Sequence, residues 1–228
     1  MSWYVFALVD APPDGPLGRG LKGALRARSA AGAYALVERR ADVPPPELGS
    51  LRRHQAVVSR IANAVPAILP VRFGTLLDDD ALDEALTDRE ADIAEAFALV
   101  RHRVQFTWRG GAKSEVPHRR SGPRVPTGLR PGMIDATQPG LQYMRQLARR
   151  ARGTPPSAFR AVREKLGRLV AMEKFEPAAM SRADSLYQLV DRDGVAGYER
   201  IARRLASEMP ALRLSGPFPP FAFAPDVL

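Results

Sequence analysis

Apolar residues at the start of the chain are spaced first as in strands and then as in a helix. The run Trp3–Val9 is continuously apolar and rich in β-forming residues, which predicts a buried, central strand. Ala33–Glu38 predicts another strand, and a short extended segment near Leu25–Ser29 is its expected partner. Helical spacing follows over residues 47–63, at Leu51, His54, Val57, Val58 and Ile61. The predicted order so far is two main strands followed by an amphipathic helix.

The next segments extend this pattern. Ala67–Leu76 predicts a third strand, and Asp78–Asp80 then cap a long helix, since carboxylates in a first turn favour the helix dipole. The core positions of that helix are Leu82, Leu86, Ile93, Phe97 and Val100. Val104–Trp108 alternates between apolar and polar side chains and predicts a final strand. The order β-β-α-β-α-β, with four main strands and two helices, suggests a modified ferredoxin-like α+β domain over residues 1–109.

The rest of the chain predicts a linker and a second domain. Residues 110–137 are rich in Gly and Pro, contain few large apolar side chains and are strongly basic, which is typical of a linker or mobile loop. Residues 138–228 predict a smaller, helix-rich α+β domain. Its expected helices lie within 141–148, 159–169 and Gly194–Met209, and its expected strands are Val170–Phe175, Ser185–Asp191 and Leu212–Leu214.

Composition and charge narrow the functional classes. The chain has 228 residues, a net charge of +9 and no cysteine, which excludes disulfides, thiolate zinc sites, iron–sulfur clusters and a cysteine nucleophile. The positive excess lies in the middle, where residues 101–130 carry 8 basic and 1 acidic side chains. Most of the basic residues are Arg, which binds carboxylates and phosphates in bidentate fashion. No stretch is long and apolar enough to span a membrane, and Trp3–Val9 is too short for a secretory signal, so we expect a cytoplasmic protein.

Patterns that would suggest an enzyme have simpler interpretations in this sequence. Gly18–Gly23 matches G-x-G-x-x-G, and Glu38 ends the following strand, where a ribose-binding acid would stand. The loop Asp10–Leu17, with three prolines, separates the first strand from these glycines, so we interpret the motif as a glycine-rich loop. The histidines lack the spacing of a helical metal site, and the acidic residues between Asp78 and Glu95 lie opposite an apolar stripe. We therefore expect no catalytic residue, metal site or cofactor.

The segment Leu69–Leu76, Leu-Pro-Val-Arg-Phe-Gly-Thr-Leu, is more specific than a generic core strand. Pro70 cannot donate a ladder hydrogen bond and belongs at a strand entry or edge. Gly74 suggests a bulge or a close approach by another element. Arg72 is expected either to pair with a carboxylate or to project from the sheet.

A second specific segment is Gly216–Phe223, Gly-Pro-Phe-Pro-Pro-Phe-Ala-Phe. Its three prolines predict an extended, polyproline-II-like conformation from which Phe218, Phe221 and Phe223 project at fixed intervals. Such a segment either packs into a groove of its own domain or presents an aromatic patch to a partner. Both readings stay open on the sequence alone.

Together these segments resemble the gas vesicle protein F/L family (GvpF/GvpL). The similarity covers nearly the whole chain, and its most specific parts are Leu69–Thr75 and Gly216–Phe223. The other matching segments are Trp3–Val9, the helix that contains His54, Gly140–Leu147 and Leu186–Val190. The chain departs from the family pattern at Gln105, usually Glu, at Phe218 and Phe221, usually Trp and Tyr, and in the poorly matched linker 109–137.

The resemblance implies a non-enzymatic role. Members of this family are accessory or minor structural proteins of gas vesicles, and they associate with the small hydrophobic shell protein and other accessory proteins during nucleation and assembly. It implies a modified ferredoxin-like N-terminal domain, an α+β C-terminal domain, and association with gas vesicles in the cytoplasm. Nucleic acid and membrane are not expected partners. The candidate partner-binding residues are Arg72, Phe73, Phe218, Phe221, Phe223, Arg119 and Arg120.

Two other functional classes remain open at this point. Ferredoxin-like sheets also bind RNA, and the Arg-rich block Arg101–Arg130 would contact phosphates. That binding mode needs exposed aromatic residues among the basic ones, and Phe106 and Trp108 are the only local candidates. An enzyme would need a closed pocket with converging polar groups. Capture of shell protein rather than nucleic acid would distinguish the first alternative, and a structure without such a pocket would discard the second.

Overall fold

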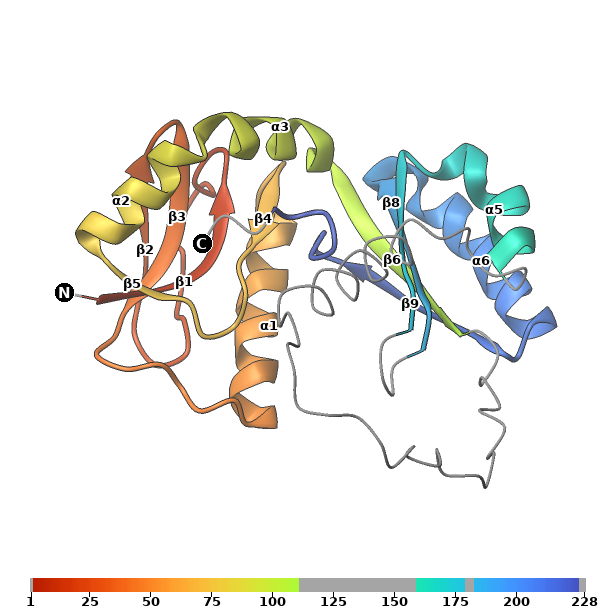
Figure 1. Ribbon diagram of the computed structural model, residues 1–228, viewed down its shortest axis with the longest axis horizontal. Helices are drawn as coiled ribbons and strands as arrows, with labels where there is room; N and C mark the ends of the chain where they lie inside the picture. Colours follow the sequence, from red (N-terminus) through yellow and green to blue (C-terminus); the bar gives the residue numbers. More distant parts are fainter. Residues whose placement is uncertain (1, 111–158, 179–182, 226–228) are drawn as a thin grey trace, which may run out of the picture.

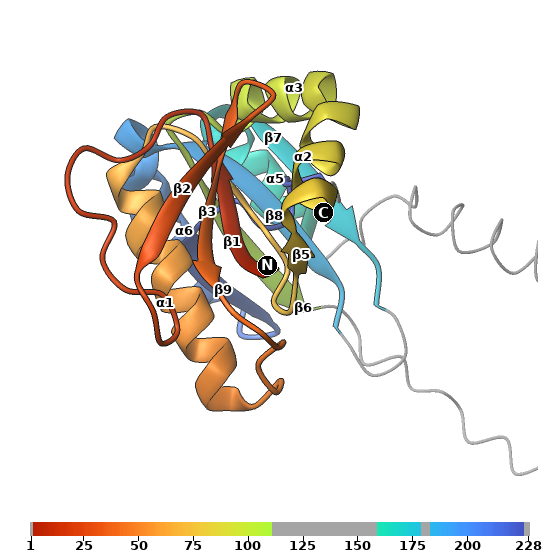
Figure 2. The same cartoon turned by 90° about the vertical axis from the view of Figure 1, so that its left-hand side faces the viewer.

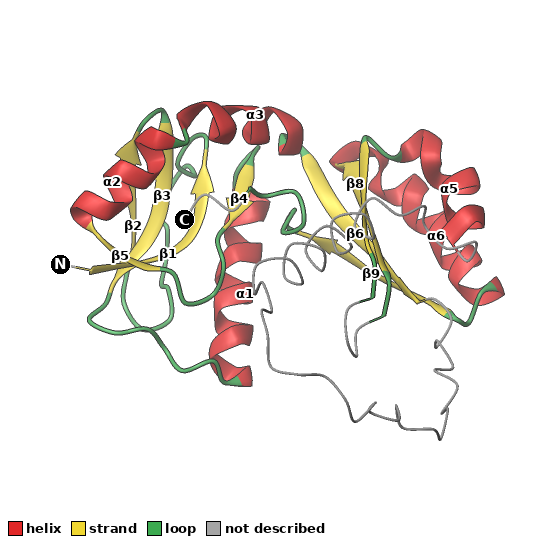
Figure 3. Cartoon of the chain, viewed as in Figure 1, coloured by secondary structure: helices red, strands yellow, loops and turns green. Residues whose placement is uncertain are grey.

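Two antiparallel sheets packed against helices make up the part of the chain that the computed structural model describes, residues 2–110, 159–178 and 183–225 (Figure 1). The first sheet contains β1 (Ser2–Val9), β2 (Leu25–Ala30), β3 (Ala33–Arg39), β4 (Ile68–Pro70) and β5 (Leu76–Asp78). The second contains β6 (Arg103–Gly110), β7 (Met172–Glu176), β8 (Ser185–Asp191) and β9 (Leu212–Phe218). The α-helices are α1 (Leu48–Ala64), α2 (Asp79–Asp88), α3 (Glu90–Val100), α5 (Arg160–Leu166) and α6 (Val195–Glu208). Figure 3 shows helices and strands in both halves, and the predicted α+β class is confirmed.

The first sheet has the strand order β2-β3-β1-β4, and β5 also pairs with β1. β1 is buried and central, as its apolar run predicted. A bulge between Val5 and Ala7 shifts the side-chain alternation along this strand. Val5 and Leu8 therefore pack with α2 and α3, while Phe6 and Val9 pack with α1. The helices cover both faces of the sheet, and Figure 2 shows α1 on one side and α2 and α3 on the other.

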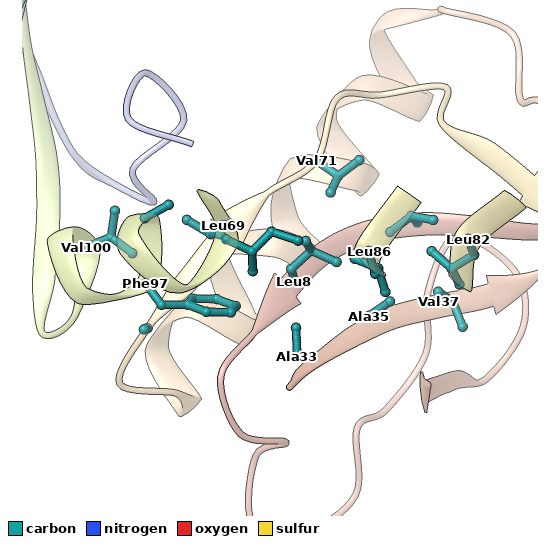
Figure 4. Close-up of a cluster of buried hydrophobic side chains, with 14 of the residues drawn as sticks. Leu8, Ala33, Ala35, Val37, Leu69, Val71, Leu82, Leu86, Phe97 and Val100 are labelled. Carbon is teal, nitrogen blue, oxygen red and sulfur yellow. The ribbon is translucent and has the colours of Figure 1, made fainter. Parts of the chain in front are cut away.

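The core beneath α2 and α3 continues into the second unit. Leu82 and Leu86 of α2 and Phe97 of α3 pack over β1, β3 and β4 (Figure 4). Full burial of one such side chain contributes roughly 1.5–3 kcal/mol. Leu189 of β8 and Phe223 near the end of the chain belong to the same cluster. The two sheets thus share apolar packing rather than being joined by a linker alone.

Two predicted elements of the first unit are divided. The expected strand Ala67–Leu76 is two short strands, β4 and β5, because the chain turns after Pro70 and pairs with β1 a second time. The expected long helix is α2 and α3, which are separated at Arg89, where φ is −118° and ψ is 18°. The predicted cap is present, since the Asp78 carboxylate accepts a 2.9 Å hydrogen bond from the N–H of Ala81. Apolar spacing runs unchanged through the break, so the sequence pattern did not reveal it.

The prediction that Val104–Trp108 completes the first sheet is wrong. β6 lies in the middle of the second sheet, between β8 and β9. In the first sheet, β3 occupies one side of β1 while β4 and β5 occupy the other, so no position beside β1 remains. Alternation identified the strand and its two faces, but not the strands that pair with it. The second sheet accordingly includes residues 103–109, which the pattern had assigned to the N-terminal domain.

The second sheet has the order β7-β8-β6-β9, and α5 and α6 pack against one of its faces. The predicted pairing of β7 with β8 is present. Within the buried face, the indole N–H of Trp108 donates to the Tyr198 hydroxyl at 2.9 Å, and that hydroxyl donates to Gln188 Oε1 at 2.7 Å. Burial raises the pKa of Tyr198, so its hydroxyl keeps the proton that it donates.

Arg192, in a 3-10 turn at Arg192–Gly194, ties the second unit to the first. Its guanidinium donates to the carbonyl oxygens of Ala62 at 2.6 Å and Val65 at 3.1 Å. These carbonyls lie at the C-terminal end of α1, where helical partners are missing and a positive charge is favourable. The cation from one unit therefore caps a helix of the other.

Some predictions lie outside the described residues. They are the linker beyond Gly110, the apolar stripe within 141–148 and the candidate partner-binding residues Arg119 and Arg120.

Candidate functional site

A cleft of about 850 Å³ lies between α1 and the turn after β4 on one side and the second sheet on the other. Its first wall carries Leu51 and His54 of α1 with Val71, Arg72 and Phe73. Its second wall is the face of the second sheet opposite α5 and α6. Figure 1 shows the end of the described chain, in blue, passing between β4 and the second sheet. The cleft is therefore built from both units.

Strand alternation gives the second wall a polar character. Along β6, Phe106 and Trp108 pack with α6, so Gln105, Thr107 and Arg109 face the cleft. The other strands of this sheet add further polar side chains to the face, Lys174, Glu176, Tyr187 and Ser215. The Tyr187 hydroxyl donates to Glu176 Oε2 at 2.8 Å. Among its described residues, the wall thus offers cationic and hydroxyl groups beside one carboxylate, which already accepts a hydrogen bond.

The turn that carries Arg72 and Phe73 is fixed by a relay of hydrogen bonds. The N–H of Gly74 donates to the Tyr4 hydroxyl at 3.2 Å, and that hydroxyl lies 2.9 Å from His54 Nδ1. His54 Nε2 lies 3.3 Å from the carbonyl oxygen of Val71. Since a carbonyl only accepts, Nε2 carries the ring proton and Nδ1 accepts from Tyr4. Gly74 has a φ of +97°, which few other residues adopt, so the position predicted as a bulge or close approach is a tight turn.

His54 stays neutral within an aromatic cluster. Its ring stacks on Phe6 with centroids 5.3 Å apart and meets Tyr4 and Phe73 edge-on. Burial lowers the pKa of His54 to about 4, and its hydrogen bond to Val71 opposes this only in part. The neutral imidazole is the form that the relay requires, so the turn bearing Phe73 has its present hydrogen bonds at neutral pH.

The end of the described chain forms the third part of the cleft. Gly216 lies so close to β6 that a Cβ there would be 2.8 Å from the Gln105 carbonyl oxygen, and its φ is +128°. Beyond β9, the segment from Pro219 turns back on itself, with the N–H of Phe223 donating to the Pro220 carbonyl. The predicted extended segment is thus a strand followed by a turn, because β6 pairs with its first half and local hydrogen bonds close its second half.

Gln105 and Lys174 hold this turn against the second sheet. The buried Gln105 side chain accepts a 2.7 Å hydrogen bond from the N–H of Ala222 through Oε1 and donates through Nε2 to Thr107. The ammonium group of Lys174 donates to the carbonyl oxygen of Ala222 at 2.9 Å. Both backbone groups of Ala222 are therefore bound by side chains from the second sheet. A glutamate at position 105 would present the same acceptor to the N–H group of Ala222.

Four of the predicted partner-binding residues meet at this cleft although they come from distant parts of the sequence. Arg72, Phe73, Phe218 and Phe221 all line it, and Phe221 is 39% exposed. Phe223 is instead 9% exposed and packs in the core shared by the two units, so in this structure it stabilises the fold.

Sequence reasoning missed Gln105 as a buried anchor and Lys174, Arg109 and Tyr187 as cleft residues. A buried amide in an alternating strand was a usable signal at Gln105, since such a group needs hydrogen-bond partners. The other three are ordinary polar residues of strands, and only their pairing places them together.

The glycine-rich motif has a structural role. The Glu38 carboxylate accepts hydrogen bonds from the N–H groups of Leu21, Lys22 and Gly23, the last at 2.8 Å. A bound phosphate would need these same donors. The interpretation of Gly18–Gly23 as a glycine-rich loop is therefore supported, and the structure adds that the loop surrounds the Glu38 carboxylate. Within the described ranges, no group of three or more His, Asp or Glu side chains could hold a metal ion, and no helix there is long and apolar enough to cross a membrane.

Comparison with known proteins gives one family. A family model described as "Gas vesicle synthesis protein GvpL/GvpF" matches residues 2–225. No curated protein matches the chain in sequence. The crystal structure of gas vesicle protein GvpF from Microcystis aeruginosa has a TM-score of 0.70 and 15% identity, covering 98% of this chain and 99% of that chain. The crystal structure of gas vesicle protein GvpF from Anabaena sp. PCC7120 has a TM-score of 0.68 and 14% identity, covering 98% and 96%. At these identities the structural similarity shows a shared fold, while the family model shows the family.

Proposed function

Because the chain belongs to the gas vesicle GvpL/GvpF family, we propose that it acts in the nucleation and assembly of gas vesicles by binding their hydrophobic shell protein and other gas vesicle proteins. In this role it is an accessory or minor structural protein, associated with gas vesicles in the cytoplasm. The family is a structural and accessory family and not a known enzyme family.

The observation that carries the proposal is the convergence at the cleft. Two motifs about 150 residues apart in the sequence, around Arg72 and around Phe221, line one open cavity together with residues of α1 and of the second sheet. Aromatic residues and Arg are the side chains most enriched where protein interfaces are energetically important. Phe221 and Leu51 are 39% and 40% exposed, so the cleft offers apolar surface that a partner would bury.

The tendency of an unassembled shell subunit to aggregate gives a physical reason for an accessory protein that binds it. A hydrophobic shell subunit exposes apolar surface and unpaired strand edges before it assembles, and both promote aggregation. A protein that covers this surface transiently, and releases it to a growing shell, lowers that hazard. Binding through apolar contacts and a few cations needs no bond-making chemistry.

Co-expression with the major shell protein tests the proposal directly. We expect the shell protein to be captured on beads that carry the tagged chain and not on beads that carry an unrelated tagged protein of similar charge. In a strain that lacks the gene, we expect few or no vesicles, with recovery when the gene is returned. Normal vesicle formation in the deletion strain, together with no capture of any gas vesicle protein, would overturn the proposal.

A further inference from the structure

We infer that the cleft recognises a segment of the gas vesicle shell protein in which a carboxylate is flanked by apolar side chains. The inference rests on the proposed function and adds the binding site and the chemistry of the bound segment. It depends on the charges of the second sheet and on the apolar groups that face the cleft from both walls.

Positive charge at the cleft exceeds the negative charge within it. Arg109 and Lys174 of the second sheet line the cavity, and Glu176 is the only acidic residue among its lining residues that the structure describes. The Glu176 carboxylate accepts from the Tyr187 hydroxyl and forms no ion pair with a described residue. Lys174 binds a neutral backbone carbonyl rather than a carboxylate. An acidic group entering the cleft would therefore meet cations that are not neutralised by Glu176.

Among the cations of the cleft, Arg109 is the clearest candidate to bind an incoming carboxylate. It is exposed on the cleft face of β6 and makes no ion pair with any residue in 2–110, 159–178 or 183–225. Arg101, Arg103 and Arg163 are also exposed or half-exposed, and each of them pairs with a carboxylate of this chain. A guanidinium with open donors beside aromatic side chains is suited to bind a carboxylate with two hydrogen bonds.

The apolar groups define the rest of the bound segment. Phe218 and Phe221 lie on the side of the second sheet, and Leu51 lies on α1 across the cavity. An occupant between them has to present apolar side chains to both walls while its carboxylate reaches Arg109. Nucleic acid fits this surface less well, because only a few cations line the described part of the cavity, whereas a phosphate backbone is bound by many.

Charge reversal at one position tests the inference. Arg109→Glu is compared with wild type, with Arg109→Lys, and with Arg200→Glu, which makes the same charge change on the exposed surface of α6. The readout is the amount of co-expressed major gas vesicle shell protein captured on beads, with thermal unfolding measured for each variant. We expect Arg109→Glu to capture about tenfold less, Arg109→Lys to lie between Arg109→Glu and wild type because it keeps the charge but not the paired donors, and Arg200→Glu to match wild type.

A second variant tests the apolar component. Phe221→Ala removes an exposed ring and is expected to reduce capture several-fold, roughly the effect of losing 1 kcal/mol or more of binding energy. Capture that is unchanged in both Arg109→Glu and Phe221→Ala overturns the inference while the proposed function stands. Equal losses in Arg200→Glu and Arg109→Glu, or binding that nuclease treatment abolishes, also overturn it. Failure of wild type to capture any gas vesicle protein overturns the proposed function and the inference with it.

Discussion

The neutral His54 makes the stability of the fold depend on pH in a defined window. Burial lowers the pKa of His54 to about 4 in the folded chain, whereas a histidine in an unfolded chain has a pKa of about 6.5. Above pH 6.5 the side chain is neutral in both states, so it adds no pH dependence. Between pH 6.5 and 4 the unfolded chain binds a proton that the folded chain does not, so stability falls as the pH falls.

The size of this effect follows from the two pKa values. At pH 5 the free energy of unfolding is about 2 kcal/mol lower than at pH 8. Below pH 4 this loss of stability levels off at about 3 kcal/mol. Protonation also breaks the relay, because a protonated Nδ1 no longer accepts from the Tyr4 hydroxyl. The turn that carries Arg72 and Phe73 would lose one of its supports at the same time.

Urea unfolding of wild type and His54→Gln at pH 8, 7, 6 and 5 measures the effect. Carboxylates elsewhere contribute equally to both proteins, so the difference between the two pH profiles isolates His54. We expect wild type to lose about 2 kcal/mol more than His54→Gln between pH 8 and 5. An NMR titration of the His54 ring supplies the folded pKa independently. Parallel pH profiles, or a ring that titrates near pH 6.5, would refute the reasoning.

Three further predictions concern stability. Tyr198→Phe leaves the buried Trp108 N–H and the Gln188 amide without their shared partner. We therefore expect the free energy of unfolding in urea to fall by about 1–3 kcal/mol, and by less than about 0.5 kcal/mol in the control Tyr34→Phe. Phe223→Ala empties part of the shared core and is expected to cost about 3 kcal/mol, against about 1 kcal/mol or less for the exposed Phe221→Ala, measured in the same assay. Arg192→Ala removes the cap on α1, so we expect a loss of about 1–2 kcal/mol and faster amide hydrogen exchange at the C-terminal end of that helix; unchanged exchange there would contradict the assigned contact.

The sequence predicted most elements and two hairpin pairings, β2 with β3 and β7 with β8, but not the partners of β6. β1, β3, α1 and α6 follow from apolar runs and helical spacing, because those signals depend only on which residues face the core. The neighbours of β6 could not be predicted, since an alternating strand fits any sheet with one buried face. The interruption at Arg89 was equally hidden, because α2 and α3 continue a single apolar stripe across it.

The candidate site also contains residues that the sequence predicted and residues that only the structure reveals. Arg72, Phe73, Phe218 and Phe221 were chosen from two unusual motifs, and both motifs lie at the cleft. The role of Phe223 could not be separated from that of Phe221 by sequence, because the turn after β9 directs neighbouring aromatic residues to different surroundings. Lys174 became visible only through its bond to Ala222, which comes 48 positions later in the chain.

The contact between Gln105 and Ala222 joins residues 117 positions apart. A nascent polypeptide emerging from the ribosome would have β6 long before it had the turn that completes the cavity wall. The cavity wall that Ala222 completes can therefore form only after translation has passed residue 222.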